Sequence, residues 1–276
     1  MYRKSLTITA LVVAVVIVLG SAWVIPKSGE QRKIVAFCGA ASKPAMEEAA
    51  QRFEEETGVG IELNFGGSGT MLSSISMSKT GDLYIPGSPD YMTKAKNLGL
   101  IYPETLKRLA YLVPAIIVQR GNPKNIRGLE DLAKPGIRVG IGDPESVCLG
   151  SYALEILKHN ELWKRVEKNI VVYAESCSKT AALITIDQVD AIIGWRVFHS
   201  WNHDKTEVVY IKPDNIPKLS YIPSAVLVYT DDREGGLEFI NFLVSEDGQE
   251  IFRRWGYLAT QQEAMEYAPN AETPGI

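Results

Sequence analysis

Short apolar segments alternate with segments of helical length along this 276-residue chain. In its first part, apolar runs with the length of buried strands lie at 34–37, 61–65 and 82–85. Each run precedes a segment with helical character, and these helices are expected at 45–56, from just after the turn at 66–70 to about 79, and at 89–98. Strands that alternate with helices in this way are typical of an α/β domain with a mainly parallel sheet.

A second alternating unit follows a loop rich in Gly, Asn and Pro at 121–124. Its strands are expected at 138–141, 170–174 and 191–193. Its helices are expected at about 128–133, 150–159 and 178–187. Two further helices, at 234–245 and 246–255, are expected to close the fold.

Two long apolar strands, 111–118 and 222–229, connect the units, and each of them contains a proline. A chain that crosses to a second lobe and later returns forms two lobes hinged around a cleft. We therefore expect lobe I over 33–113 plus 224–260 and lobe II over 114–223. Crevices at the carboxyl ends of parallel strands are where α/β folds bind ligands, so the cleft is the expected ligand site.

The N-terminal segment indicates export. No charged residue occurs from Ser5 to Pro26, a stretch of 22 residues that follows Arg3 and Lys4. A basic start, an apolar run and small residues near its end are typical of a secretory signal peptide. The run is also long enough for a membrane-spanning helix, so an uncleaved membrane anchor over 1–26 is an equal alternative. Either interpretation places the rest of the chain in the periplasm or at the extracellular face of the cytoplasmic membrane.

Composition and charge exclude one class of partner. Hydrophobic residues make up 46% and charged residues 22% of the chain, which is ordinary for a globular protein. The formal net charge is −4, and it becomes −6 once residues 1–22, with their two basic residues, are removed. This charge gives no basic footprint for nucleic acid. The last residues, 261–276, are polar and contain two prolines, and we expect them to form a flexible tail.

Four turns share one pattern, in which small or polar residues follow a strand and precede a helix. They lie at 38–44, 66–70, 143–150 and 175–179. Helix starts carry free backbone N–H groups and a positive dipole end, so turns that meet at one crevice form an anion site of neutral donors. Ser42, Ser68 and Thr70 would add hydroxyl donors. Alternatively, these residue types are simply what βα turns and helix caps require.

Common catalytic motifs do not fit these turns. The turn at 66–70 lacks the Gly-Lys-[Ser/Thr] of a P-loop, and Thr70 replaces the last glycine of Gly-x-Ser-x-Gly. His199 and His203 have a helical metal-ligand spacing, but Ser200 stands where the zinc-protease motif has glutamate. An exported serine hydrolase that uses Ser68 is therefore the weakest hypothesis. We expect a binding protein with no catalytic residue, no bound metal and no cofactor.

Five short segments stand out together by their order and spacing. They are FCGAAS at 37–42, FGGSGT at 65–70, GDLYI at 81–85, VGIGDPE at 139–145 and IFRRWGY at 251–257. Together they resemble the periplasmic molybdate-binding proteins of ABC importers, from about Lys33 to Tyr257. The resemblance implies a type II periplasmic-binding-protein fold. It also implies a monomer that captures molybdate or tungstate between its lobes and delivers the ion to the permease subunits in the membrane.

The resemblance also implies ligand-binding residues by position. It places the hydroxyl ligands at Ser42 and Ser68, and the amide ligands at Leu149 and Cys177. The tyrosine position of the family falls at Trp195, which is a departure. An indole N–H donates one hydrogen bond and cannot accept one, so oxyanion binding survives but the cavity or the ligand pose must differ.

Four neighbouring residues leave alternatives open. Cys38, Cys148 and Cys177 all fall in the turns assigned to the crevice. Thiolates of this kind suit a soft metal or a thioanion, so a binding protein for such a ligand, or for another oxyanion, is the second hypothesis. Otherwise the cysteines only pack in tight turns. Arg196 follows the tryptophan directly and either brings positive charge to the site or forms a surface salt bridge.

Overall fold

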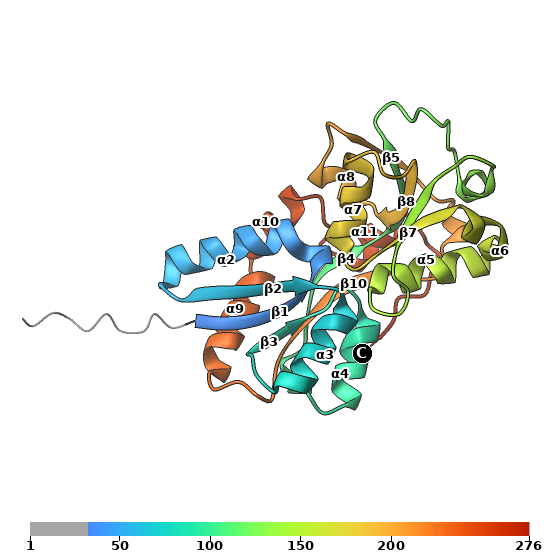
Figure 1. Ribbon diagram of the computed structural model, residues 1–276. Coiled ribbons are helices and arrows are strands. Elements are labelled where there is room, and N and C mark those ends of the chain that lie inside the picture. Colours follow the sequence, from blue (N-terminus) through green and yellow to red (C-terminus); the bar gives the residue numbers. More distant parts are fainter. Residues whose placement is uncertain (1–32, 276) are drawn as a thin grey trace, which may run out of the picture. The chain divides into compact units, whose positions relative to one another are not determined.

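The computed structural model describes residues 33–275, which contain two five-stranded sheets with helices around them (Figure 1). The first sheet has the strand order β2-β1-β3-β10-β4. Its strands are β1 (Lys33–Gly39), β2 (Gly60–Gly66), β3 (Leu83–Ile85), β4 (Lys107–Leu112) and β10 (Ser220–Val226). β1 runs parallel to β2 and β3, whereas β10 runs antiparallel to β3 and β4.

The second sheet repeats this arrangement with the order β7-β6-β8-β5-β9. Its strands are β5 (Pro114–Gln119), β6 (Val139–Gly142), β7 (Ile170–Ala174), β8 (Ala191–Trp195) and β9 (Thr206–Val209). β6 runs parallel to β7 and β8, and β5 runs antiparallel to β8 and β9. The α/β fold class is confirmed, with a parallel core in each sheet and antiparallel strands at one side.

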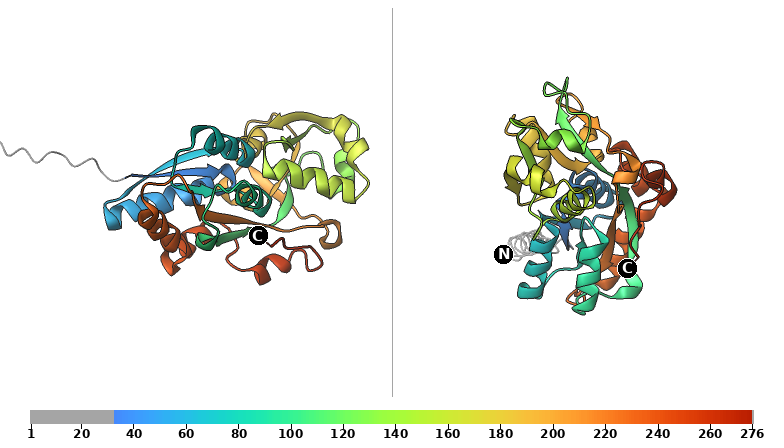
Figure 2. Two further views of the ribbon diagram at one scale, coloured as in Figure 1. Left: turned by 90° about the horizontal axis from the view of Figure 1, so that it is seen from below. Right: turned by 90° about the vertical axis from the view of Figure 1, so that its right-hand side faces the viewer.

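Each sheet has its own helices (Figure 2), and we call the two assemblies lobe I and lobe II. Helices that pack on the first sheet are α2 (Lys43–Thr57), α3 (Ser68–Ser78), α4 (Pro89–Asn97), α9 (Arg233–Val244) and α10 (Glu246–Arg254). Helices of the second group are α5 (Cys148–His159), α6 (Trp163–Val166), α7 (Cys177–Thr185) and α8 (Val197–Trp201). The expected helix at 128–133 is a 3-10 turn, Leu129–Ala133.

The crossing between the sheets differs from the expected continuous strand at 111–118. The chain leaves the first sheet at the end of β4 and enters the second with β5, so Val113 alone separates two strands with different partners. Pro114 has no backbone N–H, and it begins β5, where a missing donor is tolerated. On the return, β10 spans 220–226 rather than 222–229. It therefore begins four residues before the expected start of the second part of lobe I at 224.

The C-terminal segment is packed, although it was expected to be flexible. Residues Gln261–Met265 form α11, which begins with a capping box between Thr260 and Glu263. Ala264 and Ala268 are fully buried in the hydrophobic cluster of lobe II. A few small apolar residues are enough to anchor the segment in the core, and its polar composition conceals this signal.

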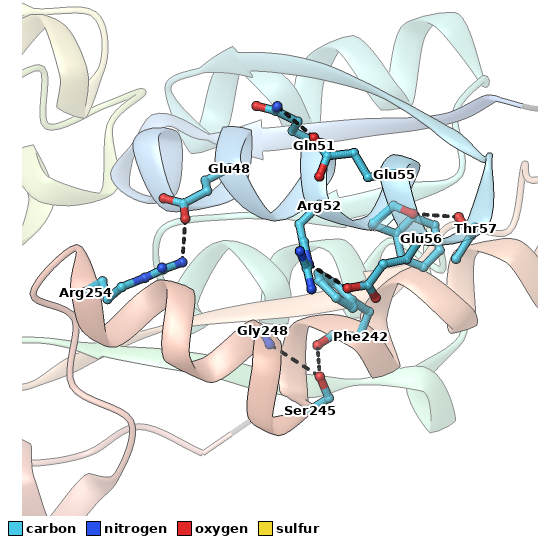
Figure 3. Close-up of polar contacts among 11 residues, drawn as sticks. Glu48, Gln51, Arg52, Glu55, Glu56, Thr57, Phe242, Ser245, Gly248 and Arg254 are labelled. Atoms are coloured by element: carbon cyan, nitrogen blue, oxygen red, sulfur yellow. Dashed lines mark hydrogen bonds and ion pairs between the residues drawn. The ribbon is translucent and has the colours of Figure 1, made fainter.

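Packing between α2 and the C-terminal helices fixes the outer side of lobe I. Phe53 of α2 contacts Phe239 and Phe242 of α9 with ring-centroid distances of 5.1 and 5.5 Å. Arg254 of α10 donates to Glu48 of α2 at 2.5 Å (Figure 3). Because these charged groups pair with one another on an exposed surface, they contribute little to the free energy of unfolding and leave the aromatic contacts dominant.

The expected signal peptide or membrane anchor at 1–26 lies outside the described residues. Among residues 33–275, no helix combines the length and the apolar character needed to cross a membrane.

Candidate functional site

The four turns singled out in the sequence meet where the two lobes contact each other. α3, α5 and α7 begin at Ser68, Cys148 and Cys177 respectively, directly after the ends of strands or short turns. The fourth turn, Ala40–Ser42, is a 3-10 turn that follows β1 and contacts α7 of the other lobe. We call the six residues Ser42, Ser68, Cys148, Leu149, Cys177 and Trp195 the seam cluster. All six are buried.

The seam itself consists of short contacts between the lobes. The backbone N–H of Gly69 in lobe I donates to the carbonyl oxygen of Ser146 in lobe II at 2.9 Å. The hydroxyl of Tyr91 donates to the carbonyl oxygen of Glu145 at 3.1 Å. A Cβ atom on Gly67 would lie 2.7 Å from the Ser146 oxygen and 2.9 Å from the Glu175 oxygen. Only a residue without a side chain therefore allows this close approach.

Ser68 is held at the start of α3 by one backbone and one side-chain donor of lobe I. Its side-chain oxygen accepts a hydrogen bond from the N–H of Gly87 at 3.0 Å, and its carbonyl oxygen accepts one from the Tyr84 hydroxyl at 2.8 Å. A Cβ atom on Gly39 would lie 2.8 Å from the Ser68 hydroxyl oxygen, so β1 passes close beside it. Ser68 is only 1% exposed. Its hydroxyl therefore points into the protein rather than capping the helix, consistent with the absence of a side-chain cap on α3.

Ser42 is also fully buried, but its hydroxyl is engaged differently. Its Oγ donates to the carbonyl oxygen of Gly39 at 3.2 Å, within the same turn. A serine hydroxyl has one proton to donate. Ser42 therefore has to give up a carbonyl acceptor before it can donate to a ligand, whereas Ser68 gives up only the Cys148 sulfur, which is a weak acceptor.

The thiols of Cys148 and Cys177 face each other inside lobe II, with their sulfur atoms 4.0 Å apart. Both residues are the first of a helix, and both cysteines are unoxidised. The hydrogen bond from the Cys177 thiol, supported by the Ser68 hydroxyl and the Leu149 N–H, lowers the pKa of Cys148 although burial opposes this. The same hydrogen bond between the two thiols, together with burial, raises the pKa of Cys177 well above its usual value. The Leu149 amide faces both sulfur atoms.

Trp195 ends β8 and closes the seam cluster from the side of the second sheet. It is completely buried, and its ring packs edge-on against Tyr152 at a centroid distance of 5.2 Å. Its Nε1 has no hydrogen-bond acceptor, although the N–H lies near the Cys177 sulfur and lowers the pKa of that thiol. A buried N–H without an acceptor costs free energy, which makes it a donor poised for a partner.

Three residues expected at or beside the site lie elsewhere. Thr70 is exposed at the rim of the seam, where it lines a surface hollow. The guanidinium of Arg196 donates to the carbonyl oxygen of Gly256 at 2.6 Å and lies over the ring of Tyr267, so it faces the C-terminal segment. Cys38 belongs to the core of lobe I, where burial raises the pKa of its thiol.

A fifth strand-end turn was missed. Pro86, Gly87 and Ser88 follow β3 and precede α4, which is the same strand, small residues and helix pattern as in the other four turns. Gly87 supplies the N–H that holds Ser68, and a Cβ atom in its place would lie 2.8 Å from the Cys148 sulfur. The Ser88 hydroxyl is buried without a partner. Its pattern in the sequence was sufficient to find it.

The acidic turn at 143–145 has a local role. Asp143 accepts hydrogen bonds from the Glu145 N–H at 3.1 Å and from the Ser146 hydroxyl at 2.6 Å, so it caps its own turn. Within residues 33–275, no cluster of three or more His, Cys, Asp or Glu side chains could hold a metal ion. The site is therefore built from hydroxyl, amide, indole and thiol groups.

Comparison with known proteins identifies a family and a similar relative. The family model described as bacterial extracellular solute-binding protein matches residues 34–258. The molybdate-binding protein ModA of Escherichia coli is 26% identical over 234 residues, which cover 83% of this chain and 90% of ModA.

Two solved structures show the same fold at lower sequence identity. The periplasmic molybdate-binding protein of Azotobacter vinelandii is 16% identical with a TM-score of 0.72, and the match covers 83% of this chain and all of that one. The sulfate-binding protein SubI of Mycobacterium tuberculosis is 18% identical with a TM-score of 0.69, and the match covers 88% of this chain and 92% of SubI. Both likenesses support the two-lobed type II fold.

Proposed function

This chain belongs to the bacterial extracellular solute-binding proteins, and we propose that it captures a tetrahedral oxyanion of the molybdate or tungstate class for an ABC transporter. The ion would lie at the seam cluster, between the lobes. A membrane permease would then accept it from the closed protein. Capture and delivery involve no catalysis, in keeping with the binding proteins to which the chain is similar.

The observation that carries the proposal is the buried Trp195 N–H, which has no acceptor and lies beside the Cys177 sulfur at the start of α7. Ser68 and the Leu149 amide add donors from the opposite lobe and from α5. Helix N-termini and oriented N–H groups stabilise negative charge without a cationic side chain. The same arrangement suits a protein whose net charge is itself negative.

The donor set also favours oxyanions that carry no proton. Tryptophan donates one hydrogen bond and accepts none, and backbone N–H groups likewise only donate. A protonated oxyanion, such as hydrogen phosphate at neutral pH, presents a hydroxyl that requires an acceptor. A site that offers only donors leaves this hydroxyl unpaired, which weakens binding of the protonated anion. Molybdate, tungstate and sulfate are fully deprotonated, so discrimination among them depends on the size that the closed seam accepts.

Calorimetric titration of the purified, reduced protein with tungstate, molybdate, sulfate and phosphate tests the proposal. We expect tungstate or molybdate to bind with a stoichiometry of one and to bind more tightly than sulfate or phosphate. At a ligand concentration of 100 times Kd, the free energy of unfolding should rise by about 2.7 kcal/mol. Absence of binding by every oxyanion in this panel would refute the proposal.

Trp195→Phe provides the residue-level test because it removes the N–H and keeps an aromatic ring against Tyr152. Loss of a hydrogen bond to a charged ligand costs about 1.5–3 kcal/mol, so affinity should fall about 10-fold or more. Tyr210→Phe, which changes an exposed ring, serves as the matched control and should leave affinity unchanged.

A further inference from the structure

The seam cluster contains a pair of thiols that oxyanion binding does not require. We propose that Cys148 and Cys177 together form a two-coordinate site for a soft monovalent cation of the Cu(I) type. Thiolate ligands select such cations, whereas hard cations prefer oxygen. The site would lie within lobe II and would be reached when the seam between Gly69 and Ser146 opens.

The separation of the two sulfur atoms fits a linear complex. They lie 4.0 Å apart. With metal–sulfur bonds of about 2.3 Å, the length found for zinc thiolates, a linear sulfur–metal–sulfur unit spans roughly 4.6 Å. The sulfur atoms therefore need to separate by only about half an ångström, which side-chain rotation provides. A disulfide, at about 2.05 Å, would instead require them to approach by about 2 Å.

The surroundings stabilise the charge of such a complex. Each cysteine is the first residue of a helix of nine or more residues, so both sulfur atoms lie at positive dipole ends. The Trp195 N–H, which has no acceptor and is completely buried, lies beside the Cys177 sulfur. An N–H donor of this kind offsets negative charge on a metal-bound thiolate. A monovalent cation with two thiolates carries one negative charge, the same sign as an oxyanion.

Binding requires no change of oxidation state. Two S–H bonds break, two metal–sulfur bonds form, and two protons leave to the solvent. Cys38 takes no part, because it lies in the core of lobe I and burial alone accounts for the properties of its thiol. The structure thus divides the three cysteines into a facing pair and a separate core residue, which provides a matched control.

Titration of the fully reduced protein with Cu(I) under anaerobic conditions, against a coloured Cu(I) chelator, tests this proposal. We expect the wild type and Cys38→Ser to take one equivalent, and Cys148→Ser and Cys177→Ser each to lose affinity by 100-fold or more. X-ray absorption of the wild-type complex should show two sulfur neighbours. The assignment would be overturned if the wild type, Cys148→Ser and Cys177→Ser bound Cu(I) with equal affinity. It would also be overturned if X-ray absorption showed three sulfur neighbours.

The X-ray absorption measurement uses only the wild type, so the proposal stays testable even where a serine variant fails to fold.

A second experiment, competition between Cu(I) and tungstate, rests on the proposed oxyanion function, because both ligands would use the same donors. Prior loading with Cu(I) should abolish tungstate binding. The copper titration contains no oxyanion and the tungstate titration contains no copper, so the failure of either proposal is seen independently of the other.

Discussion

The backbone N–H of Gly87 donates to the hydroxyl oxygen of Ser68 at 3.0 Å, and the single hydroxyl proton of Ser68 is directed to the Cys148 sulfur, a weak acceptor. Ser42 shows the opposite arrangement, because its proton already goes to the Gly39 carbonyl oxygen at 3.2 Å. The two serines that were both expected as hydroxyl ligands are therefore unequal as donors. Ser68 exchanges a weak sulfur acceptor for the anion, whereas Ser42 has to exchange a carbonyl oxygen.

We expect Ser68→Ala to weaken tungstate binding about 10-fold or more, and Ser42→Ala to weaken it less. A hydrogen bond to a charged group contributes about 1.5–3 kcal/mol, and Ser68 loses only a weak bond to the Cys148 sulfur when it donates to an anion, whereas Ser42 loses a bond to a carbonyl oxygen. Ser74→Ala is the matched control, since Ser74 lies in the same helix and its exposed hydroxyl bonds only to the Thr70 carbonyl oxygen. Calorimetric titration of the three variants measures the difference. Equal affinities for Ser68→Ala and the wild type would show that Ser68 has only a structural role.

Gly67→Ala should reduce oxyanion affinity about 10-fold or more and leave the ligand-free protein almost as stable as the wild type. The backbone at Gly67, with φ −63° and ψ 141°, suits any residue, so alanine introduces no strain there. Its Cβ would instead lie 2.7 Å from the Ser146 oxygen of lobe II, and the lobes would have to separate. Because separation affects closure rather than the folding of either lobe, the free energy of unfolding should change by less than about 1 kcal/mol.

Gly60→Ala is the control for this comparison, since the nearest atom to an added Cβ there is 3.5 Å away and φ is ordinary. Titration with tungstate and urea unfolding without ligand give the two quantities. An affinity loss that is matched by an equal loss of stability in the Gly67 variant would contradict the closure argument.

The parts of the fold that depend on strand and helix periodicity were accessible from the sequence. The turns that lead into the helices at Ser68, Cys148 and Cys177 are examples. A strand followed by small residues and a helix places each such turn at the same edge of a parallel sheet. The exchange of partner strands at Val113 was not accessible. Both strands there are apolar, and periodicity does not reveal which sheet an apolar residue joins.

Side-chain direction was likewise beyond the sequence. Arg196 directly follows a residue of the seam cluster, yet its guanidinium faces Gly256 and Tyr267, which lie 60 or more residues further along the chain. The contact depends on the packed C-terminal segment, whose polar composition predicted flexibility. Cys148 and Cys177 were expected near the crevice, but their facing sulfur atoms follow from how α5 and α7 pack on β6 and β8.

The Asp190 carboxylate gives lobe II a pH-dependent contribution to stability. Burial would raise its pKa, but hydrogen bonds from the Arg138 side chain and backbone N–H outweigh this and lower it. A lowered carboxyl pKa stabilises the folded protein above the unfolded value of about 3.9, and this contribution is lost as the pH falls through the folded pKa. Asp190→Asn should therefore cost about 1.5–3 kcal/mol at pH 7, and the difference from the wild type should shrink below about pH 4.

Urea unfolding of both proteins between pH 7 and the acid limit of folding measures this dependence. Asp204→Asn, at a residue whose side chain is 80% exposed, should show a much smaller effect at each pH. If the loss of unfolding free energy in Asp190→Asn stayed constant down to low pH, the shape of the Asp190 side chain rather than its charge would determine its contribution to stability.

Arg196→Met should lower stability without weakening oxyanion binding. The variant loses a hydrogen bond to the Gly256 carbonyl oxygen and a cation–π contact with Tyr267, whose centroid lies 5.3 Å from the guanidinium carbon. Together these contribute about 1–2 kcal/mol, whereas methionine keeps most of the apolar stem. Arg120→Met, which removes an exposed arginine, sets the background for loss of one positive charge. If tungstate affinity falls 10-fold in Arg196→Met but not in Arg120→Met, Arg196 supplies charge to the ligand, and the assignment of a site built from neutral donors alone is wrong.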